Sequence, residues 1–309
     1  MNGIRILATG RALPQKMVTN DDLSRVMDTS DQWIRTRTGI RQRYFCTEET
    51  CLSLAIAAAK QAVDRSGIDK NKIGLVIVAT ATADHVFPST ACMIQKALGL
   101  PKEVMAFDLS AACSGFLYGL GVCQSFLKNH SRPYALLVGS EQMSKILNKE
   151  DRSTYVLFGD GAGAAVLTLD DHEFYHRFWS DGNLSSLCCR GVGREEQFLS
   201  MEGASVFKFA VKAIEEGIKE ILRASGKTID EIDYVVCHQA NERIIDHVAG
   251  KYQGSTFYKN MDRYANTSAA SIPIALDEMY EKDLLKKGMK IICVGFGAGF
   301  TWSSALLTI

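Results

Sequence analysis

The chain has 309 residues, of which 47% are hydrophobic and 23% are charged, with 35 basic side chains balanced by 35 acidic ones. This composition is typical of a compact globular protein and argues against intrinsic disorder. The zero net charge and the lack of a long basic run argue against a nucleic-acid-binding protein, and no apolar stretch is long enough to predict a membrane protein.

The N-terminal segment and the cysteines predict a cytoplasmic protein. The first residues, MNGIRILATG, have neither the charged region nor the long apolar region of a secretory signal. The nine cysteines are an odd number and are scattered through apolar runs, which favours free thiols in a reducing compartment. Cys188 and Cys189 are adjacent and no CxxC motif occurs, so we expect no metal site.

The first predicted unit along the chain is a helix, a turn and a buried strand. Residues 52–63, LSLAIAAAKQAV, have apolar side chains at helical spacing, and residues 73–81, IGLVIVATA, read as a strand buried on both faces. The same unit recurs later, because SGIDKNKIGLVIVATA from Ser66 aligns without a gap with SGKTIDEIDYVVCHQA from Ser225, at an offset of 159 residues.

Two more pairs of segments support this repeat. AFDLSAACSG resembles NMDRYANTSAAS, with Asp108 and Asp262 at an offset of 154, and YALLVGS resembles KIICVGF at an offset of 156. Generic βα units look alike, but they rarely preserve both order and spacing. We therefore predict a duplicated α/β fold with halves at residues 1–170 and 171–309, and with the catalytic groups where the halves meet.

Cys113 is the candidate nucleophile. It follows a strand predicted to end at Asp108 and Leu109 and precedes a helix predicted to begin near Ser114. A helix N-terminus favours thiolate, and the small neighbouring residues leave room for an acyl group. A lone cysteine is more often a small buried hydrophobic residue, so this context alone does not establish catalysis.

His238 and Asn266 are the candidate partners of Cys113. His238 follows a strand predicted to end at Cys237 in the second half, and Asn266 lies one residue from the position that the alignment pairs with Cys113. Singly, a core imidazole and a helix cap are the more common roles. Together, at matched places in a duplication, they favour a Cys/His/Asn site.

Such a site suits decarboxylative condensation better than hydrolysis. A neutral histidine and an asparagine amide can both donate to a thioester oxygen, which stabilises the enolate formed when malonate loses carbon dioxide. The Gly-rich GFGAGFTW segment can supply the backbone N–H of Ala298, which together with that of Cys113 forms an oxyanion hole. The alternative is a simple tight turn, which is also how we interpret GDGAGAA from Gly159.

Seven blocks extend this pattern over nearly the whole chain: TSDQWIRTRTGIRQR, FPSTACMIQ, DLSAACSGF, GDGAGAAVL, CHQANERII, YANTSAASIP and GFGAGFTW. In these blocks the chain resembles the β-ketoacyl-acyl-carrier-protein synthase III enzymes of the thiolase superfamily. The resemblance implies a thiolase-like duplicated five-layered αβαβα fold, usually homodimeric. It also implies that acetyl-CoA or another short acyl-CoA acylates Cys113, and that malonyl-acyl-carrier-protein then loses carbon dioxide with help from His238 and Asn266. CoA thioesters are substrates, and no cofactor is expected.

The resemblance also assigns binding residues. It implies that Trp33 and Arg152 flank the CoA adenine and that Arg37 and Arg243 lie near its phosphates or the carrier-protein entrance, with Asn241 near the pantetheine path. Phe87 and Phe296 match positions that border the acyl pocket. Lys208 and Lys251 are candidates to meet the acidic carrier protein, although lysine on an amphipathic helix usually belongs only to a solvated face. Without the resemblance, most of these residues would be taken as ordinary surface or core side chains.

Several departures from the family pattern concern specificity. DGNLSSLCCRG has Cys188 where a bulky aliphatic pocket residue often stands, and the connection from Gly191 to Phe198 looks short. Glu242 and Asp246 add negative charge beside Arg243.

Other activities remain open from the sequence. The nearest alternative is a condensing enzyme of secondary metabolism that uses another acyl donor or extender. A chalcone-synthase-like enzyme, a true thiolase using Cys293, a silent acyl-binding subunit and a cysteine hydrolase fit the sequence less well.

Overall fold

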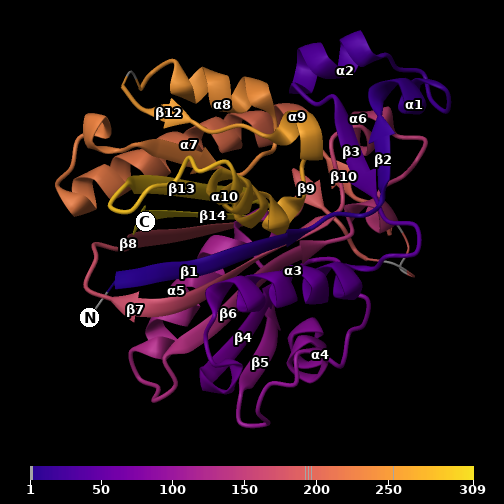
Figure 1. Ribbon diagram of the computed structural model, residues 1–309. Helices are drawn as coiled ribbons and strands as arrows, with labels where there is room; N and C mark the ends of the chain where they lie inside the picture. Colours follow the sequence, from indigo (N-terminus) through magenta and orange to yellow (C-terminus); the bar gives the residue numbers. More distant parts are fainter. Residues whose placement is uncertain (1–2, 192, 194, 196, 253) are drawn as a thin grey trace.

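The computed structural model describes residues 3–191, 193, 195, 197–252 and 254–309 (Figure 1). Its centre is formed by two five-stranded mixed sheets. The first sheet has the strand order β1 (Gly3–Ala12), β7 (Gly161–Asp170), β6 (Tyr134–Glu141), β4 (Ile73–Ala79) and β5 (Met105–Leu109). The second has the order β8 (Tyr175–Asn183), β14 (Gly299–Thr308), β13 (Lys290–Gly297), β11 (Tyr234–Cys237) and β12 (Thr256–Phe257).

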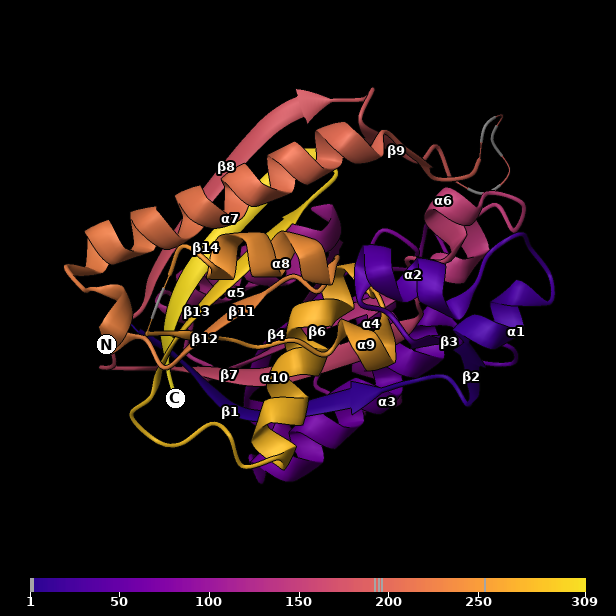
Figure 2. The same ribbon diagram turned by 90° about the horizontal axis from the view of Figure 1, so that it is seen from above.

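Helices cover both sheets and fill the space between them, which gives five layers (Figures 1 and 2). Helices α3 (Cys51–Ser66) and α4 (Thr90–Ala97) lie outside the first sheet, and α7 (Gly203–Ser225) and α8 (Glu242–Ala249) lie outside the second. Helices α5 (Gly115–Leu127) and α10 (Ser271–Glu281) are enclosed between the sheets, which explains their apolar sequences. The predicted αβαβα fold is confirmed.

The two sheets repeat one topology, as the gap-free alignment predicts. Helix α3 ends at Ser66 and α7 ends at Ser225, and each is followed by a left-handed glycine, Gly67 with φ 64° and Gly226 with φ 67°. The 3-10 turn η1 (Lys70–Lys72) then leads into β4, and the 3-10 turn η4 (Ile229–Glu231) leads into β11. The last strand of the first sheet along the chain ends at Asp170, and the first strand of the second sheet begins at Tyr175. The division of the chain into halves at residues 170 and 171 stays a prediction.

One anchor of the predicted alignment is wrong. Asp108 lies in β5, whereas Asp262 lies in a short helix, α9 (Met261–Tyr264). The equivalence resumes at the 3-10 turns η2 (Ala112–Ser114) and η5 (Ser268–Ala270), where Ala112 and Ser268 have matching left-handed φ values of 45° and 50°. Cys113 is therefore equivalent to Ala269, and Asn266 lies three residues from that position rather than one.

Shorter elements form a cap at one end of the layers (Figure 2). They are β2 (Lys16–Thr19), α1 (Asn20–Ser24), α2 (Asp31–Thr38), β3 (Gln42–Phe45), η3 (Met143–Ile146), α6 (Arg152–Tyr155), β9 (Leu187–Cys188) and β10 (Ser200–Met201). Arg43 is fully buried and holds the cap together, since its guanidinium donates to the Asn20 side chain and to the Val156 carbonyl, both at 2.8 Å. The connection predicted to be short, from Gly191 to Phe198, lies partly outside the described residues.

A buried carboxylate joins the halves. Asp277 of α10 accepts from the guanidinium of Arg11 at 2.6 Å and from that of Arg65 at 2.8 Å, both in the first half. The oxygen that accepts from Arg65 also accepts from the Thr9 hydroxyl at 2.8 Å. Removing one partner from such a buried network is costly, so α10 and the turn η5 before it are held firmly against the first sheet. Among the helices that the structure describes, none has the length and apolarity to cross a membrane.

Candidate active site

A cavity of about 710 Å³ lies where the two sheets and the cap meet. Cys113, which precedes α5, and His238 and Asn266, which follow β11 and α9, all line this cavity. The cavity is also lined by Trp33, Arg37, Cys188, Asn241, Arg243, Phe296 and Ala298. Its wall is largely apolar, so polar groups that reach it act in a poorly hydrated space.

Cys113 sits at the tip of η2, directly before α5. Ala112 takes a left-handed φ of 45°, which is uncommon for a residue with a Cβ, and this turn presents the sulfur to the cavity. The Sγ atom lies 3.4 Å from the Ser268 hydroxyl, and the residue is 9% exposed.

The resting sulfur is a thiol, which differs from the sequence-based expectation of a thiolate. Burial raises the pKa of Cys113 to about 12, and the Ser268 hydrogen bond lowers it only in part. The helix N-terminus is present as predicted, but removal from water disfavours the charged form more strongly. Acylation of Cys113 therefore needs a group that takes the thiol proton.

His238 is a buried, neutral imidazole beside the cavity. It follows β11, and its backbone N–H donates to the Val294 carbonyl at 2.7 Å. Its Nδ1 lies 2.6 Å from the Ser271 hydroxyl, and its ring packs edge-on against Phe296. Burial lowers the pKa of His238 to about 3. When Ser271 donates to Nδ1, the proton of the neutral ring is on Nε2, which leaves that N–H as a donor.

Hydrogen bonds of its backbone and of its side chain fix the position of Asn266. Its N–H donates to the Leu157 carbonyl at 3.0 Å, and its carbonyl accepts from the N–H of Gly159 at 3.0 Å. The side-chain Oδ1 accepts from the Ser268 N–H at 2.9 Å. This last bond fixes the amide orientation, because a backbone N–H requires the oxygen, and it leaves the NH₂ group as the donor.

The Gly-rich turn closes over the nucleophile. Ala298 connects β13 and β14, and its carbonyl accepts from the Thr301 hydroxyl at 3.1 Å. The same hydroxyl lies 3.0 Å from the carbonyl of Ala111 and 2.8 Å from the Ser114 hydroxyl, which ties this turn to the Cys113 turn. Ala298 is not among the described residues with a positive φ, so alanine meets no backbone strain in this Gly-rich turn.

Two guanidinium groups lie close to the Trp33 ring. The Cζ atom of Arg37 is 4.7 Å from the ring centre, and that of Arg152 is 5.0 Å from it. Arg152 lies outside the residues that line the cavity and also donates to the Asp28 carbonyl at 2.5 Å. An aromatic ligand between Trp33 and Arg152 therefore requires that Arg152 move aside.

Asn241 and Arg243 lie at the start of α8, on the cavity wall. Asn241 caps the helix by accepting the Arg243 N–H at 2.9 Å, and it donates to the Arg37 carbonyl at 3.0 Å. Its amide is therefore engaged by the fold. Glu242 and Asp246 both pair with Lys259, at 2.7 and 2.8 Å, so much of their charge is balanced there rather than beside Arg243.

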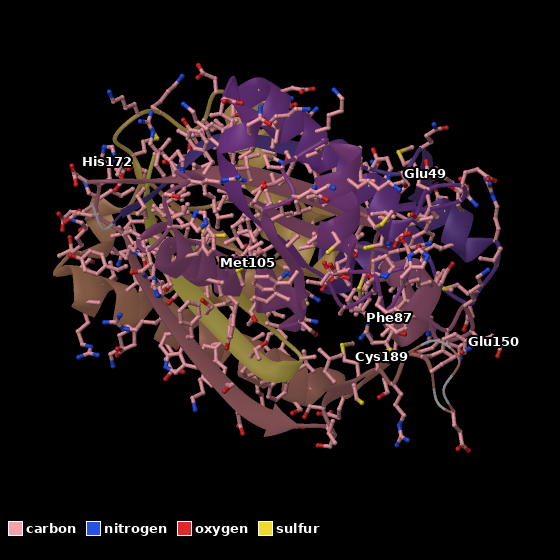
Figure 3. The ribbon with its side chains drawn as sticks, turned by 90° about the horizontal axis from the view of Figure 1, so that it is seen from below. Glu49, Phe87, Met105, Glu150, His172 and Cys189 are labelled. Atoms are coloured by element: carbon pink, nitrogen blue, oxygen red, sulfur yellow. The ribbon has the colours of Figure 1, made fainter. Side chains whose placement is uncertain are left out.

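The predicted acyl-pocket residues divide into two groups. Cys188 and Phe296 line the cavity, whereas Phe87 does not and is 83% exposed (Figure 3). Within one chain, Phe87 therefore borders no part of this pocket. Of the two lysines predicted to meet the carrier protein, Lys208 is exposed and Lys251 pairs with Glu215 at 2.5 Å.

Sequence reasoning missed the polar residues that orient the three central side chains. They are Glu141, Ser268, Ser271 and Thr301. The only sequence signals were a hydroxyl two residues after Asn266 and an acidic residue at the end of the apolar run YALLVGSE.

The duplicated five-layered fold, with Cys113, His238 and Asn266 around one apolar cavity, defines a thiolase-like condensing enzyme. Two segments, residues 107–181 and 222–309, match the families described as 3-oxoacyl-[acyl-carrier-protein (ACP)] synthase III and its C-terminal region. A Clostridium botulinum (strain Loch Maree / Type A3) protein named β-ketoacyl-[acyl-carrier-protein] synthase III is 46% identical over 99% of both chains. The chain belongs to the β-ketoacyl-acyl-carrier-protein synthase III family and is an acyltransferase.

Solved structures agree with this family. The structure of 3-oxoacyl-[acyl-carrier-protein] synthase III from Aquifex aeolicus VF5 has a TM-score of 0.94 and 41% identity, covering 99% of this chain and 100% of that one. A priming β-ketosynthase from the R1128 polyketide biosynthetic pathway also has a TM-score of 0.94, with 32% identity over 100% of this chain and 96% of that one.

Proposed function

We propose that this chain joins a short acyl-CoA, expected to be acetyl-CoA, to malonyl-acyl-carrier-protein and so begins type II fatty-acid synthesis. The products are a 3-oxoacyl-acyl-carrier-protein, carbon dioxide and free CoA. The observation that carries this proposal is the convergence of Cys113, His238 and Asn266, from opposite halves, on one apolar cavity.

In the first half-reaction, the Cys113 sulfur attacks the thioester carbonyl and CoA leaves. The backbone N–H groups of Cys113 and Ala298 are the proposed oxyanion hole for the tetrahedral adduct. Support comes from the close packing of the two turns, which the Thr301 hydroxyl links. Donors fixed in this way need no rearrangement when charge develops.

In the second half-reaction, the malonyl thioester loses carbon dioxide and its carbanion attacks the acyl group on Cys113. His238 Nε2–H and the Asn266 amide are the proposed donors to the enolate oxygen. A neutral histidine suits this role, because burial keeps the pKa of His238 near 3 and the ring uncharged at neutral pH. The apolar wall strengthens both hydrogen bonds and limits hydrolysis of the acyl-enzyme.

The carriers are proposed to enter from the cap side. The CoA adenine would stack on Trp33 once Arg152 moves aside, and Arg37 and Arg243 would meet its phosphates or the acidic carrier protein. Asn241 would act near the pantetheine path mainly by holding the start of α8 against α2, through its hydrogen bond to the Arg37 carbonyl. Lys208 and Lys251 are further proposed contacts for the carrier protein.

A homodimer is proposed through the free edge of the first sheet. Strand β5 is at that edge, and its Met105 is 52% exposed (Figure 3). An unpaired edge with apolar side chains favours pairing with a second copy. Phe87 would then border the acyl pocket of the partner rather than its own. Met105→Asp should yield a monomer in analytical ultracentrifugation, and a dimer that persists would contradict this interface.

The cytoplasm is the proposed location. All nine cysteines are free thiols, which suits a reducing compartment.

The function is tested by a panel of acyl-CoA primers, each offered with malonyl-acyl-carrier-protein and, separately, with malonyl-CoA. We expect the 3-oxoacyl product on the carrier protein with short primers, and no product with Cys113→Ala. The likeness to the R1128 priming ketosynthase favours a second candidate, priming of a polyketide with another acyl donor or extender. Turnover only with primers other than acetyl-CoA, or only with malonyl-CoA, would favour that alternative.

A further inference from the structure

Glu141, the last residue of β6, is completely buried behind the nucleophile. One carboxyl oxygen receives the Ser268 hydroxyl at 3.0 Å, and the other receives the backbone N–H of Ala81 at 3.2 Å and the Thr82 hydroxyl. Among the described residues no cation forms an ion pair with Glu141. A buried carboxyl group without a cation is costly to keep, and the condensation chemistry above leaves it without a role.

The hydrogen bonds run in one direction, from the thiol to the carboxyl group. The Cys113 thiol donates to the Ser268 hydroxyl at 3.4 Å, and that hydroxyl donates to Glu141 Oε1 at 3.0 Å. The Thr82 hydroxyl accepts from the Gln142 N–H at 2.9 Å, so its own proton is free to point to Glu141. The backbone N–H of Ala81 can only donate. These partners fit a carboxylate that accepts from all of them.

Cys113 needs a base, and the other nearby groups are poor candidates. The imidazole of His238 is engaged by Ser271 at Nδ1, and its pKa of about 3 makes it a weak base. Cys51, which faces the same cluster across Thr80, is itself a buried thiol with a pKa raised to about 11. Asp84 is paired with Lys145 at 3.2 Å.

Glu141 is better matched to proton transfer. Burial raises its pKa, while the bonds from Thr82, Ala81, Ser268 and Ala269 lower it. Overall the pKa of Glu141 is raised, which makes this carboxylate a stronger base than an ordinary exposed one.

We propose that Ser268 and Glu141 form a proton relay, in which Glu141 takes the Cys113 proton during acylation and returns it during condensation. Ser268 touches the reacting sulfur and is a catalytic residue, whereas Glu141 acts through Ser268. The relay rests on the acylation of Cys113 proposed above.

During acylation, the thiol proton moves to the Ser268 oxygen while the Ser268 proton moves to Glu141. The sulfur forms its bond to the acyl carbon, the C–S bond to CoA breaks, and CoA leaves as a thiolate that takes a proton from water. During condensation, the carbanion forms the new C–C bond and the acyl C–S bond breaks. The Cys113 thiolate then recovers its proton from Glu141 through Ser268, and one proton has been consumed in the whole cycle.

The relay makes a prediction about when that proton is taken up. With acetyl-CoA alone at pH 7 in weak buffer, the wild-type protein should take up about one proton per acetyl group bound, since the thiol proton stays on Glu141. In Glu141→Gln the thiol proton leaves with CoA, so uptake should be absent and acylation about 10²-fold slower. Glu103→Gln, at an exposed glutamate, is the control and should behave as wild type.

The measurement combines a pH indicator with the mass of the Cys113 peptide. An infrared difference spectrum gives a second readout, a carboxylic acid band that appears on acetylation and is absent in Glu141→Gln. Ser268→Ala should abolish proton uptake as well, and Glu141→Asp should restore part of it. If a variant fails to fold, proton uptake and the carboxylic acid band of the wild-type protein still decide the test.

An acetyl adduct on Cys113 without proton uptake and without the carboxylic acid band would overturn the relay while leaving the proposed function intact. Absence of the adduct would overturn both.

Discussion

A Cβ atom placed on Gly297 would lie 2.8 Å from the backbone nitrogen of Cys113 and 3.2 Å from its sulfur. The end of β13 in the second half thus packs directly on the nucleophile turn of the first half. Real Cβ atoms essentially never come so close to a backbone nitrogen, so only glycine allows the two turns to approach each other in this way.

Gly297→Ala should therefore displace Cys113 from the proposed oxyanion hole. We expect acetylation of Cys113 to slow by about 10²-fold, because donor geometry is lost, and stability to fall by about 1–3 kcal/mol through overpacking. Stopped-flow acylation and urea unfolding measure the two effects. Gly182→Ala, where an added Cβ meets nothing within 4 Å, should change neither. Normal acylation by Gly297→Ala would show that the contact between the turns is not needed.

Asn266→Asp should separate the two half-reactions. The substitution keeps an oxygen for the Ser268 N–H but removes the NH₂ donor. We expect carbon dioxide release from malonyl-acyl-carrier-protein to fall by about 10²–10³-fold, while acetylation of Cys113 persists. Asn129→Asp, an exposed residue, is the control. Equal loss of both steps would argue that Asn266 shapes the site rather than stabilising the enolate.

The sequence predicted the repeat, and it selected three residues that the structure places around one cavity, because these features depend on local patterns. The structure contains the helices predicted from their periodicity and the Ser-Gly turns that end them at Ser66 and Ser225. His238 was found because it directly follows a buried strand. The Asp108 and Asp262 match was wrong because β12 and α9 break the repeat before η5. Similarity of residue types did not reveal that change in local structure.

Burial and tertiary contacts account for what the sequence did not reveal. Cys113 is a thiol because it is removed from water. The sequence predicts the helix N-terminus at this residue but not its burial. Glu141 lies 127 residues from Ser268 along the chain, and no local pattern joins them. The exposure of Phe87 likewise depends on how the loop after β4 leaves the sheet.

Trp33→Ala should weaken CoA binding without changing the chemistry. The ring contacts the Arg37 and Arg152 guanidinium groups, and stacking of this kind is worth about 1 kcal/mol. The KM for acetyl-CoA should rise by roughly 5- to 10-fold with kcat nearly unchanged. Arg223→Ala, an exposed arginine of α7 paired with Glu220, should leave KM as it is. A fall in kcat at constant KM would contradict a binding role.

His238 should make the protein acid-sensitive. Its pKa is near 3 in the folded chain and about 6.5 when unfolded, so the unfolded state binds an extra proton between these values. The folded state is therefore stabilised above pH 6.5 and loses that stability as the pH falls. Between pH 7.5 and 5, wild type should lose about 2 kcal/mol more than His238→Gln in urea unfolding. Parallel losses in both proteins would mean that the imidazole is hydrated or already charged.

The most direct test of the central claim is the mass of the peptide that contains Cys113 after the protein is incubated with acetyl-CoA alone. We predict one acetyl group on that peptide in wild type, His238→Gln and Asn266→Asp, and none in Cys113→Ala. An unmodified peptide in wild type, or an acetyl group that remains in Cys113→Ala, would contradict the assignment of this sulfur as the acyl carrier.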